Sequence, residues 1–154
     1  MISLIGTYEC KIDIKSRIML PVNLKRQFGD YINQSFIVKR SVFQDCLELH
    51  PFSEWKLTMK KINKLNKFVK KNNDFIRRYN AGVRIIEFDN NGRLLIPKEL
   101  SKQYFSSNEL VLTSAINIIE IWDKSKYEKV INDSEIDFAQ LSESVMGNLS
   151  NDVS

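Results

Sequence analysis

The sequence predicts an α+β protein in which two tandem β-α-β-β-α units interlock. Three observations predict this class: an internal repeat, short alternating or fully apolar segments typical of strands, and Pro-led segments suited to short helices. Residues 11–24 and 87–100 align at a constant offset of 76. They share Asp13/Asp89, Arg17/Arg93, Pro21/Pro97 and Leu24/Leu100, and residues 46–55 are similar to 118–127 at an offset of 72. Each half of the chain is therefore expected to contain the same order of elements.

The first unit is predicted to begin with a hairpin. Residues 8–12 alternate between apolar and polar side chains, as in a half-buried strand, and residues 13–16 then form a tight turn. Residues 18–20 are all apolar and are expected to return as a buried strand. Pro21 ends that strand and suits the first turn of a helix over 22–28. A second hairpin is expected from residues 35–39 and 46–49.

The second unit repeats this order. Its turn at residues 89–92 reads Asp-Asn-Asn-Gly, residue types that accept positive φ. A buried strand is expected at 94–96 and a helix at 98–104, directly after Pro97. A hairpin from 110–114 and 117–121 follows, and Asp123 or Ser125 can cap a last helix around 126–131.

One longer helix over 53–71 is predicted to connect the units. Ser53 can cap it, and apolar residues recur every three to four positions from Trp55 to Phe68. Its other face holds Lys56, Lys60, Lys61, Lys64, Lys67, Lys70 and Lys71. This lysine face is either simply solvated or adds sequence-independent attraction to phosphates. Membrane-surface binding ranks lower because the core needs the apolar face. The tail from Asn132 is acidic and is expected to be frayed or mobile.

Each unit alone has few core residues, and its hairpins would leave sheet edges open. Pairing the units around a pseudo-two-fold axis would cover those edges. The predicted architecture is therefore a pair of interlocked half-barrels flanked by helices. The chain divides into a first repeat at 5–55, a connecting helix and linker at 56–80, a second repeat at 81–131 and an acidic tail at 132–154.

Composition argues against several classes of protein. The chain has 154 residues, 43% of them hydrophobic, so it can bury a core without disulfides or metals. No apolar run reaches the ~18 residues of a membrane span, and the first residues lack the features of a secretory signal. Cys10 and Cys46 form no CxxC pair, which fits a reducing cytoplasm, and His50 is the sole histidine. We therefore expect no metal, no cofactor, no membrane association and no enzymatic activity.

The charge of the chain is unevenly distributed. All 23 Lys and Arg residues lie at or before Lys129, whereas five of the 19 Asp and Glu residues follow Val130. Residues 1–130 therefore carry a net +9 and the remaining residues carry −5. A body this basic favours a polyanionic partner, with nucleic acid first, although such charge also serves solubility.

The repeated D-x-x-x-R turns are the candidate binding sites. An exposed Asp–Arg pair stabilises a fold by only ~0–1 kcal/mol, so folding alone hardly requires it twice. The planar fork of Arg17 suits a guanine edge or a phosphate, and Asp13 would orient it. Lys11 and Lys15 add charge beside the first turn. In the second copy Glu87 and Asn91 replace these lysines, so that copy either contacts DNA or serves packing between halves or subunits.

The segments DIKSRIMLP and DNNGRLLIP, with the later HPFSEW and EIWD segments, resemble the MraZ family, a bacterial group related to the swapped-hairpin AbrB-type regulators. The resemblance spans residues 5 to 149. It implies a double-split β-barrel in a cytoplasmic, nucleoid-associated protein. It also implies a ring of identical subunits that binds repeated DNA elements upstream of the division and cell-wall gene cluster. Ser16 departs from the family pattern, in which Gly is usual, so the first turn is less tolerant of positive φ.

We therefore expect a sequence-specific DNA-binding transcriptional regulator that acts as a homo-oligomer on double-stranded DNA with short direct repeats. The expected DNA-binding residues are Lys11, Asp13, Lys15 and Arg17. Asp89 and Arg93 form a second motif that binds DNA or is structural. The alternative is an oligomeric scaffold or protein-interaction module without specific DNA binding.

Overall fold

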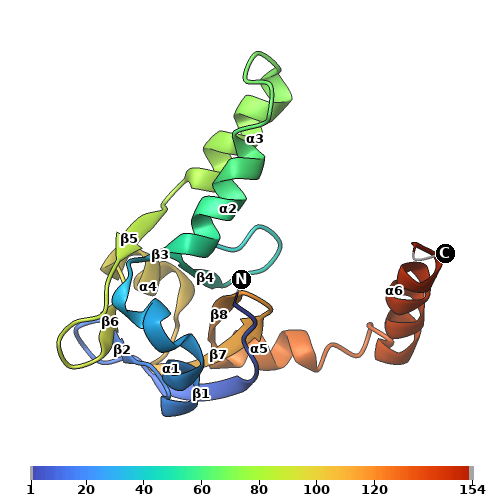
Figure 1. The fold of residues 1–154 in the computed structure, drawn as a ribbon. Helices are drawn as coiled ribbons and strands as arrows, with labels where there is room; N and C mark the ends of the chain where they lie inside the picture. Colours follow the sequence, from blue (N-terminus) through green and yellow to red (C-terminus); the bar gives the residue numbers. More distant parts are fainter. Residues whose placement is uncertain (1, 153–154) are drawn as a thin grey trace.

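The computed structural model describes residues 2–152. Its first half contains β1 (Thr7–Lys11), β2 (Arg17–Met19), α1 (Val22–Phe28), the 3-10 helix η1 (Gly29–Asn33), β3 (Phe36–Arg40), β4 (Leu47–Pro51) and α2 (Phe52–Ile62). Its second half contains α3 (Lys70–Asn80), β5 (Arg84–Ile86), β6 (Arg93–Leu95), α4 (Lys98–Tyr104), β7 (Glu109–Ala115), β8 (Ile118–Asp123), α5 (Lys124–Ile131) and α6 (Phe138–Asp152). The fold of the described residues is mixed α+β (Figure 1). The helices predicted at 22–28 and 98–104 are confirmed.

The strands form a six-stranded sheet and a separate two-stranded ribbon. The sheet order is β1-β7-β8-β4-β3-β5, and β2 pairs with β6 in the ribbon, all antiparallel. β1 therefore pairs with a strand of the second half of the chain, and β5 pairs with a strand of the first half. The sheet is open at β1 and β5, so the strands described here do not close into a barrel.

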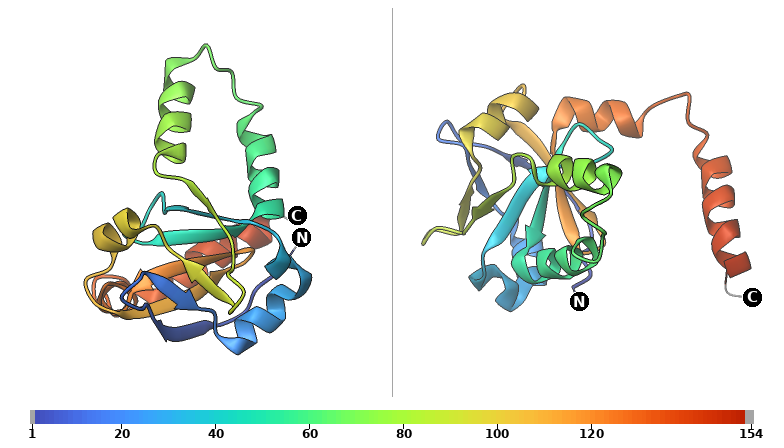
Figure 2. Two further views of the ribbon diagram at one scale, coloured as in Figure 1. Left: turned by 90° about the vertical axis from the view of Figure 1, so that its left-hand side faces the viewer. Right: turned by 90° about the horizontal axis from the view of Figure 1, so that it is seen from above.

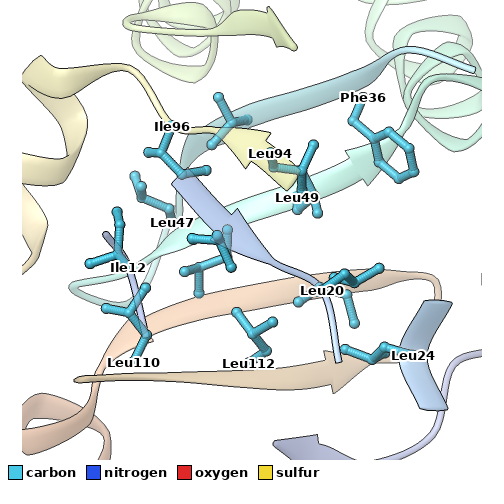
Figure 3. Packing of buried hydrophobic residues seen from close by; sticks show 14 of the residues in the cluster. Ile12, Leu20, Leu24, Phe36, Leu47, Leu49, Leu94, Ile96, Leu110 and Leu112 are labelled. Carbon is cyan, nitrogen blue, oxygen red and sulfur yellow. The ribbon is translucent and has the colours of Figure 1, made fainter. Parts of the chain in front are cut away.

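The core lies between the ribbon and one face of the sheet. Ile18 and Leu94 are paired at the centre of the ribbon and are both almost completely buried. Figure 3 shows labelled side chains from the ribbon and the sheet, among them Leu94, Leu49 and Leu112, packed in one layer. Burying one such side chain stabilises the fold by roughly 1.5–3 kcal/mol, and this sets the ribbon firmly on the sheet.

The opposite face of the sheet is covered in two places. Cys46, Val111 and Trp122 form a small buried cluster, and Tyr127 of α5 packs against it. At the other place Trp55 of α2 packs edge-on against His50, with ring centroids 5.5 Å apart. Both tryptophans are buried, and each lies between a strand and a helix of its half of the chain.

The prediction of one helix over 53–71 was wrong. The chain instead forms α2 and α3, which project from the sheet as a helical hairpin (Figures 1 and 2). Asn66 explains the break, because its side-chain oxygen accepts the backbone N–H of Phe68, a bond that competes with helical pairing. Ser53 is not the cap either: Pro51 occupies the cap position, and the backbone N–H of Ser53 donates to the Gln34 side chain.

The tail was predicted to be frayed or mobile, but residues 138–152 form α6. Asp137 stands immediately before this helix, and its carboxylate accepts the backbone N–H of Gln140, as an N-cap residue does. The first helical hydrogen bond, from the Leu141 N–H to the Asp137 carbonyl, begins at the same residue. In Figure 1 and in the right-hand view of Figure 2, α6 stands apart from the rest of the fold.

Candidate nucleic-acid interface

The first D-x-x-x-R turn joins β1 to β2 and is organised by one carboxylate. Asp13 Oδ1 accepts the backbone N–H groups of Lys15 at 2.9 Å and of Arg17 at 2.8 Å. Its other oxygen, Oδ2, accepts the Arg17 Nε–H at 2.8 Å. A backbone bond from the Asp13 N–H to the Arg17 carbonyl closes the turn. Asp13 therefore holds both the turn and the guanidinium of Arg17, as expected for an orienting residue.

The second turn, between β5 and β6, has the same arrangement. Asp89 Oδ1 accepts the backbone N–H groups of Asn91 and Arg93, each at 2.9 Å. The Arg93 Nε lies 3.4 Å from Asp89 Oδ2, which makes a longer ion pair than the one at the first turn. The second copy thus has the geometry of the first, with a less tightly held guanidinium.

Both turns need a residue with positive φ at the same position. Gly92 supplies it in the second turn, with a φ of 77°, and Ser16 supplies it in the first, with a φ of 64°. Ser16 therefore adopts the conformation that Gly adopts, despite the side chain. Its hydroxyl lies 3.0 Å from the Ser101 hydroxyl of α4, within hydrogen-bond distance, and this contact holds the turn against α4.

The carboxylates of both turns are stabilised in their charged form. The pKa of Asp13 lies below its ordinary value, chiefly because it accepts the Arg17 backbone N–H and also because of the Arg17 guanidinium. The pKa of Asp89 is lowered chiefly by the Arg93 backbone N–H, and the charge of Arg17 lowers it further. Arg17 therefore acts electrostatically on both turns.

The two arginines point to the same side of the β2–β6 ribbon. Arg17 is paired with Leu95 and Met19 is paired with Arg93, and paired residues in an antiparallel ribbon share a face. Ile18 and Leu94, between them in sequence, point into the core. The outer face of the ribbon, defined as Arg17, Met19, Arg93 and Leu95, presents two half-buried guanidiniums between two exposed apolar side chains.

Three lysines lie around this face in different ways. Lys15 is exposed in the first turn. Lys11 is exposed near the end of β1, directly opposite Glu109 of β7, so an acid partly offsets its charge. Lys25 of α1 was missed, although its Nζ lies beside Gly92 of the second turn. In the sequence it aligns with Ser101 at the offset of 76, and only the structure shows that Ser101 contacts the first turn in the equivalent place.

The lysines of the predicted 53–71 helix are exposed on the α2–α3 hairpin, away from the β2–β6 ribbon. Lys70 forms an ion pair with Asp74, and the others extend around the hairpin. The described residues contain no group of three or more His, Cys, Asp or Glu side chains arranged to hold a metal ion. None of the helices within residues 2–152 has both the length and the apolarity that crossing a membrane requires.

Comparison with known proteins identifies the relatives of this chain. The family model described as "MraZ protein, putative antitoxin-like" matches residues 3–78 and 81–149. A protein of Flavobacterium psychrophilum named Transcriptional regulator MraZ is 60% identical over 152 residues, covering 99% of this chain and 97% of its own. Proteins of the same name from Christiangramia forsetii and Pediococcus pentosaceus are 59% and 33% identical, over 96% and 92% of this chain and 96% and 95% of their own.

Proposed function

The chain belongs to the MraZ family, and from this premise we propose that it is a sequence-specific DNA-binding transcriptional regulator acting in the bacterial cytoplasm on the nucleoid. The observation that carries the proposal is the pair of equivalent Asp–Arg turns whose arginines share the outer face of the ribbon. The relatives are named as transcriptional regulators, which supports the same role.

The ribbon is a suitable reading element. The major groove of B-DNA admits a two-stranded β-ribbon, and an arginine fork donates two parallel hydrogen bonds to a guanine edge. Because Asp13 already orients Arg17, less side-chain freedom is lost on binding. Exposed Met19 and Leu95 beside the arginines can contact thymine methyl groups. Lys15 supplies a contact to phosphate, and Lys11 a weaker one because of Glu109.

We assign the interlocked arrangement to two tandem repeats, at residues 5–55 and 81–131. The strand order reads the same from either end once β1, β3 and β4 are equated with β5, β7 and β8. Ile18 faces its repeat equivalent Leu94, and Glu48 faces its equivalent Glu120. A pseudo-two-fold axis through these two pairs would relate the halves as in a double-split barrel, with 56–80 as the connection and 132–154 as the tail.

A ring of identical subunits would give the regulator its affinity. One ribbon makes few contacts, but linked subunits convert each later contact into an intramolecular event. Neighbouring ribbons reading one side of the duplex need elements repeated at about one helical turn, ~10 bp. The expected target is a set of short direct repeats upstream of the division and cell-wall gene cluster.

A gel-shift with the DNA upstream of the gene tests this function. The protein should shift that DNA at concentrations where a scrambled fragment of equal length stays unbound. Equal binding to both fragments would contradict sequence-specific regulation. An oligomer that binds neither fragment would favour the alternative, an oligomeric scaffold or protein-interaction module.

A further inference from the structure

Helix α6 carries an apolar face that its own fold does not cover. Phe138, Leu141, Val145 and Leu149 are each about half exposed or more, with Phe138 at 78%. At 100° per residue these four side chains fall within about 80° of one another around the helix axis. A stripe of this kind is normally buried against another element. In Figure 1 and the right-hand view of Figure 2, however, the helix stands apart from the body.

A cleft elsewhere on the molecule combines exposed apolar side chains with basic ones, and so complements the apolar stripe and the acids of the tail. It lies between the end of β3, α3 and α4, has a volume of about 330 Å³, and is lined by Lys39, Arg40, Ser41, Val42, Phe75, Arg78, Tyr79 and Tyr104. Val42 and Phe75 expose apolar surface there, at 55% and 43%. We refer to these eight residues as the β3–α3 cleft.

The charges of the cleft and of the tail are opposite. The cleft lining contains two arginines and a lysine and no acid among the described residues. Lys39 is buried and has Glu48 as its partner, at 3.7 Å, so Arg40 and Arg78 carry the charge that a ligand would meet. The segment after Val130 carries five acids and no base. An apolar stripe flanked by acids thus matches an apolar floor flanked by arginines.

We propose that α6 of one subunit docks in the β3–α3 cleft of a neighbouring copy. This inference rests on the proposed homo-oligomer and names the contact that links its subunits. Because the helix and the cleft are different surfaces, the contact is head-to-tail, and such contacts generate rings when the rotation closes. Asp133, Glu135 and Asp137 lie between α5 and α6, and in this arrangement they would face the arginines of the neighbouring cleft.

The first test changes the apolar stripe in the full chain. Leu141→Asp/Val145→Asp should lower the mass measured by light scattering from that of the oligomer toward that of one or a few subunits. The matched control is Gln140→Asp/Ser144→Asp, which adds the same two charges one position earlier, about 100° around the helix. The control should keep the wild-type mass. A wild-type mass in the stripe variant would overturn the proposal, as would a monomeric wild-type chain.

The second test identifies the receiving surface. Phe75→Asp in the cleft should dissociate the oligomer, whereas Phe68→Asp, at an equally apolar but fully exposed position in the α2–α3 connection, should not. When the stripe variant and Phe75→Asp are mixed, the intact helix of one can dock in the intact cleft of the other. The mixture should then contain pairs of about twice 18.0 kDa that neither variant forms alone.

Mixtures that do not associate would overturn the head-to-tail contact. The wild-type gel-shift separates this inference from the proposed function. If the wild-type protein fails to shift its upstream DNA yet loses mass in the stripe variant, the regulator assignment fails and the contact stands. If the stripe variant keeps both mass and DNA binding, the contact fails and the regulator assignment stands.

Discussion

The positions of the two cysteines in the fold disfavour the reactive, deprotonated form of their thiols. Burial raises the pKa of Cys10 to about 11 and, with help from nearby carboxylates, that of Cys46 to about 12. The thiolate is the reactive form, so both thiols should resist a disulfide reagent at pH 8 in the native protein. In denaturant both should react at the rate of an unhindered thiol. Rapid modification of Cys46 in the native protein would contradict its burial.

The carboxylates of the two turns should remain ionised at a lower pH than an ordinary Asp carboxylate does. A lowered pKa means that the stabilising hydrogen bonds are complete above the ordinary Asp value of about 3.9 and are lost only as pH falls through the lower folded value. An NMR titration of Asp13 should show this. In Arg17→Ala the pKa should stay depressed, because the backbone N–H at position 17 is the largest cause. A return to the ordinary value would mean that the turn had opened.

Single residues were predictable where their role is local. Asp13 and Arg17 form a turn within five residues, so their spacing alone predicted their contact. Lys25 could not be found this way, because it reaches the second turn only through the pairing of β2 with β6, strands of different halves. For the same reason the sequence places Arg17 and Arg93 in two separate loops. The pairing of β2 with β6 brings both to the outer face of the ribbon.

Among the elements, the buried ion pair of Lys39 on β3 with Glu48 on β4, beside Tyr79 of α3, allows a test of how the sheet is stabilised. Lys39 is almost fully buried against Glu48 and lies 4.2 Å from the Tyr79 ring centroid. Burial alone would raise the pKa of Glu48, but His50 and Lys39 together lower it. Glu48→Gln leaves Lys39 without its partner and should cost on the order of 3 kcal/mol in the free energy of unfolding.

Urea denaturation of Glu48→Gln measures that cost, with Glu109→Gln, at the exposed first residue of β7, as the control. The stabilisation from Glu48 should be complete above the ordinary Glu pKa of about 4.3 and should fall as pH drops below it. Equal unfolding midpoints for the two variants would show that the buried pair adds nothing.

Elements were predictable where a local signal fixes their ends. Pro21 and Pro97 mark the starts of α1 and α4, and both helices lie where the sequence placed them. The apolar periodicity over 53–71 runs through a break that it could not predict, because the break is set by the Asn66 side chain and because Phe68, late in the periodic run, is fully exposed. In the tail the acidic composition suggested disorder, but the Asp137 cap and the apolar stripe of α6 favour a helix.

For the whole molecule, the acidic tail should weaken binding to random DNA. Asp133→Asn/Glu135→Gln/Asp137→Asn removes three charges and keeps a side-chain acceptor at the cap of α6. This variant should bind random DNA more tightly than wild type at low salt, and the difference should shrink as salt rises. Fluorescence anisotropy at two salt concentrations measures both affinities. A difference that persists at high salt would have a cause other than charge.

The exchange of strands between halves was predicted in outline from the repeat and from the open edges of each unit. The partner of each strand was not, because alternation within β1 indicates a half-buried strand without naming its neighbour. Likewise, counting charged residues along the sequence identified the acidic tail, but only the fold shows that α6 stands away from the body.

The central claim is that the outer face of the β2–β6 ribbon reads DNA. A gel-shift of Arg17→Ala and Arg93→Ala on the upstream DNA, with light scattering on the same samples, tests it most directly. Each variant should keep the wild-type mass and lose specific binding, since a lost guanine contact costs ~1–3 kcal/mol and a ring repeats that loss. If both variants bind the upstream DNA like wild type, or if either loses binding only because the oligomer falls apart, the claim is contradicted.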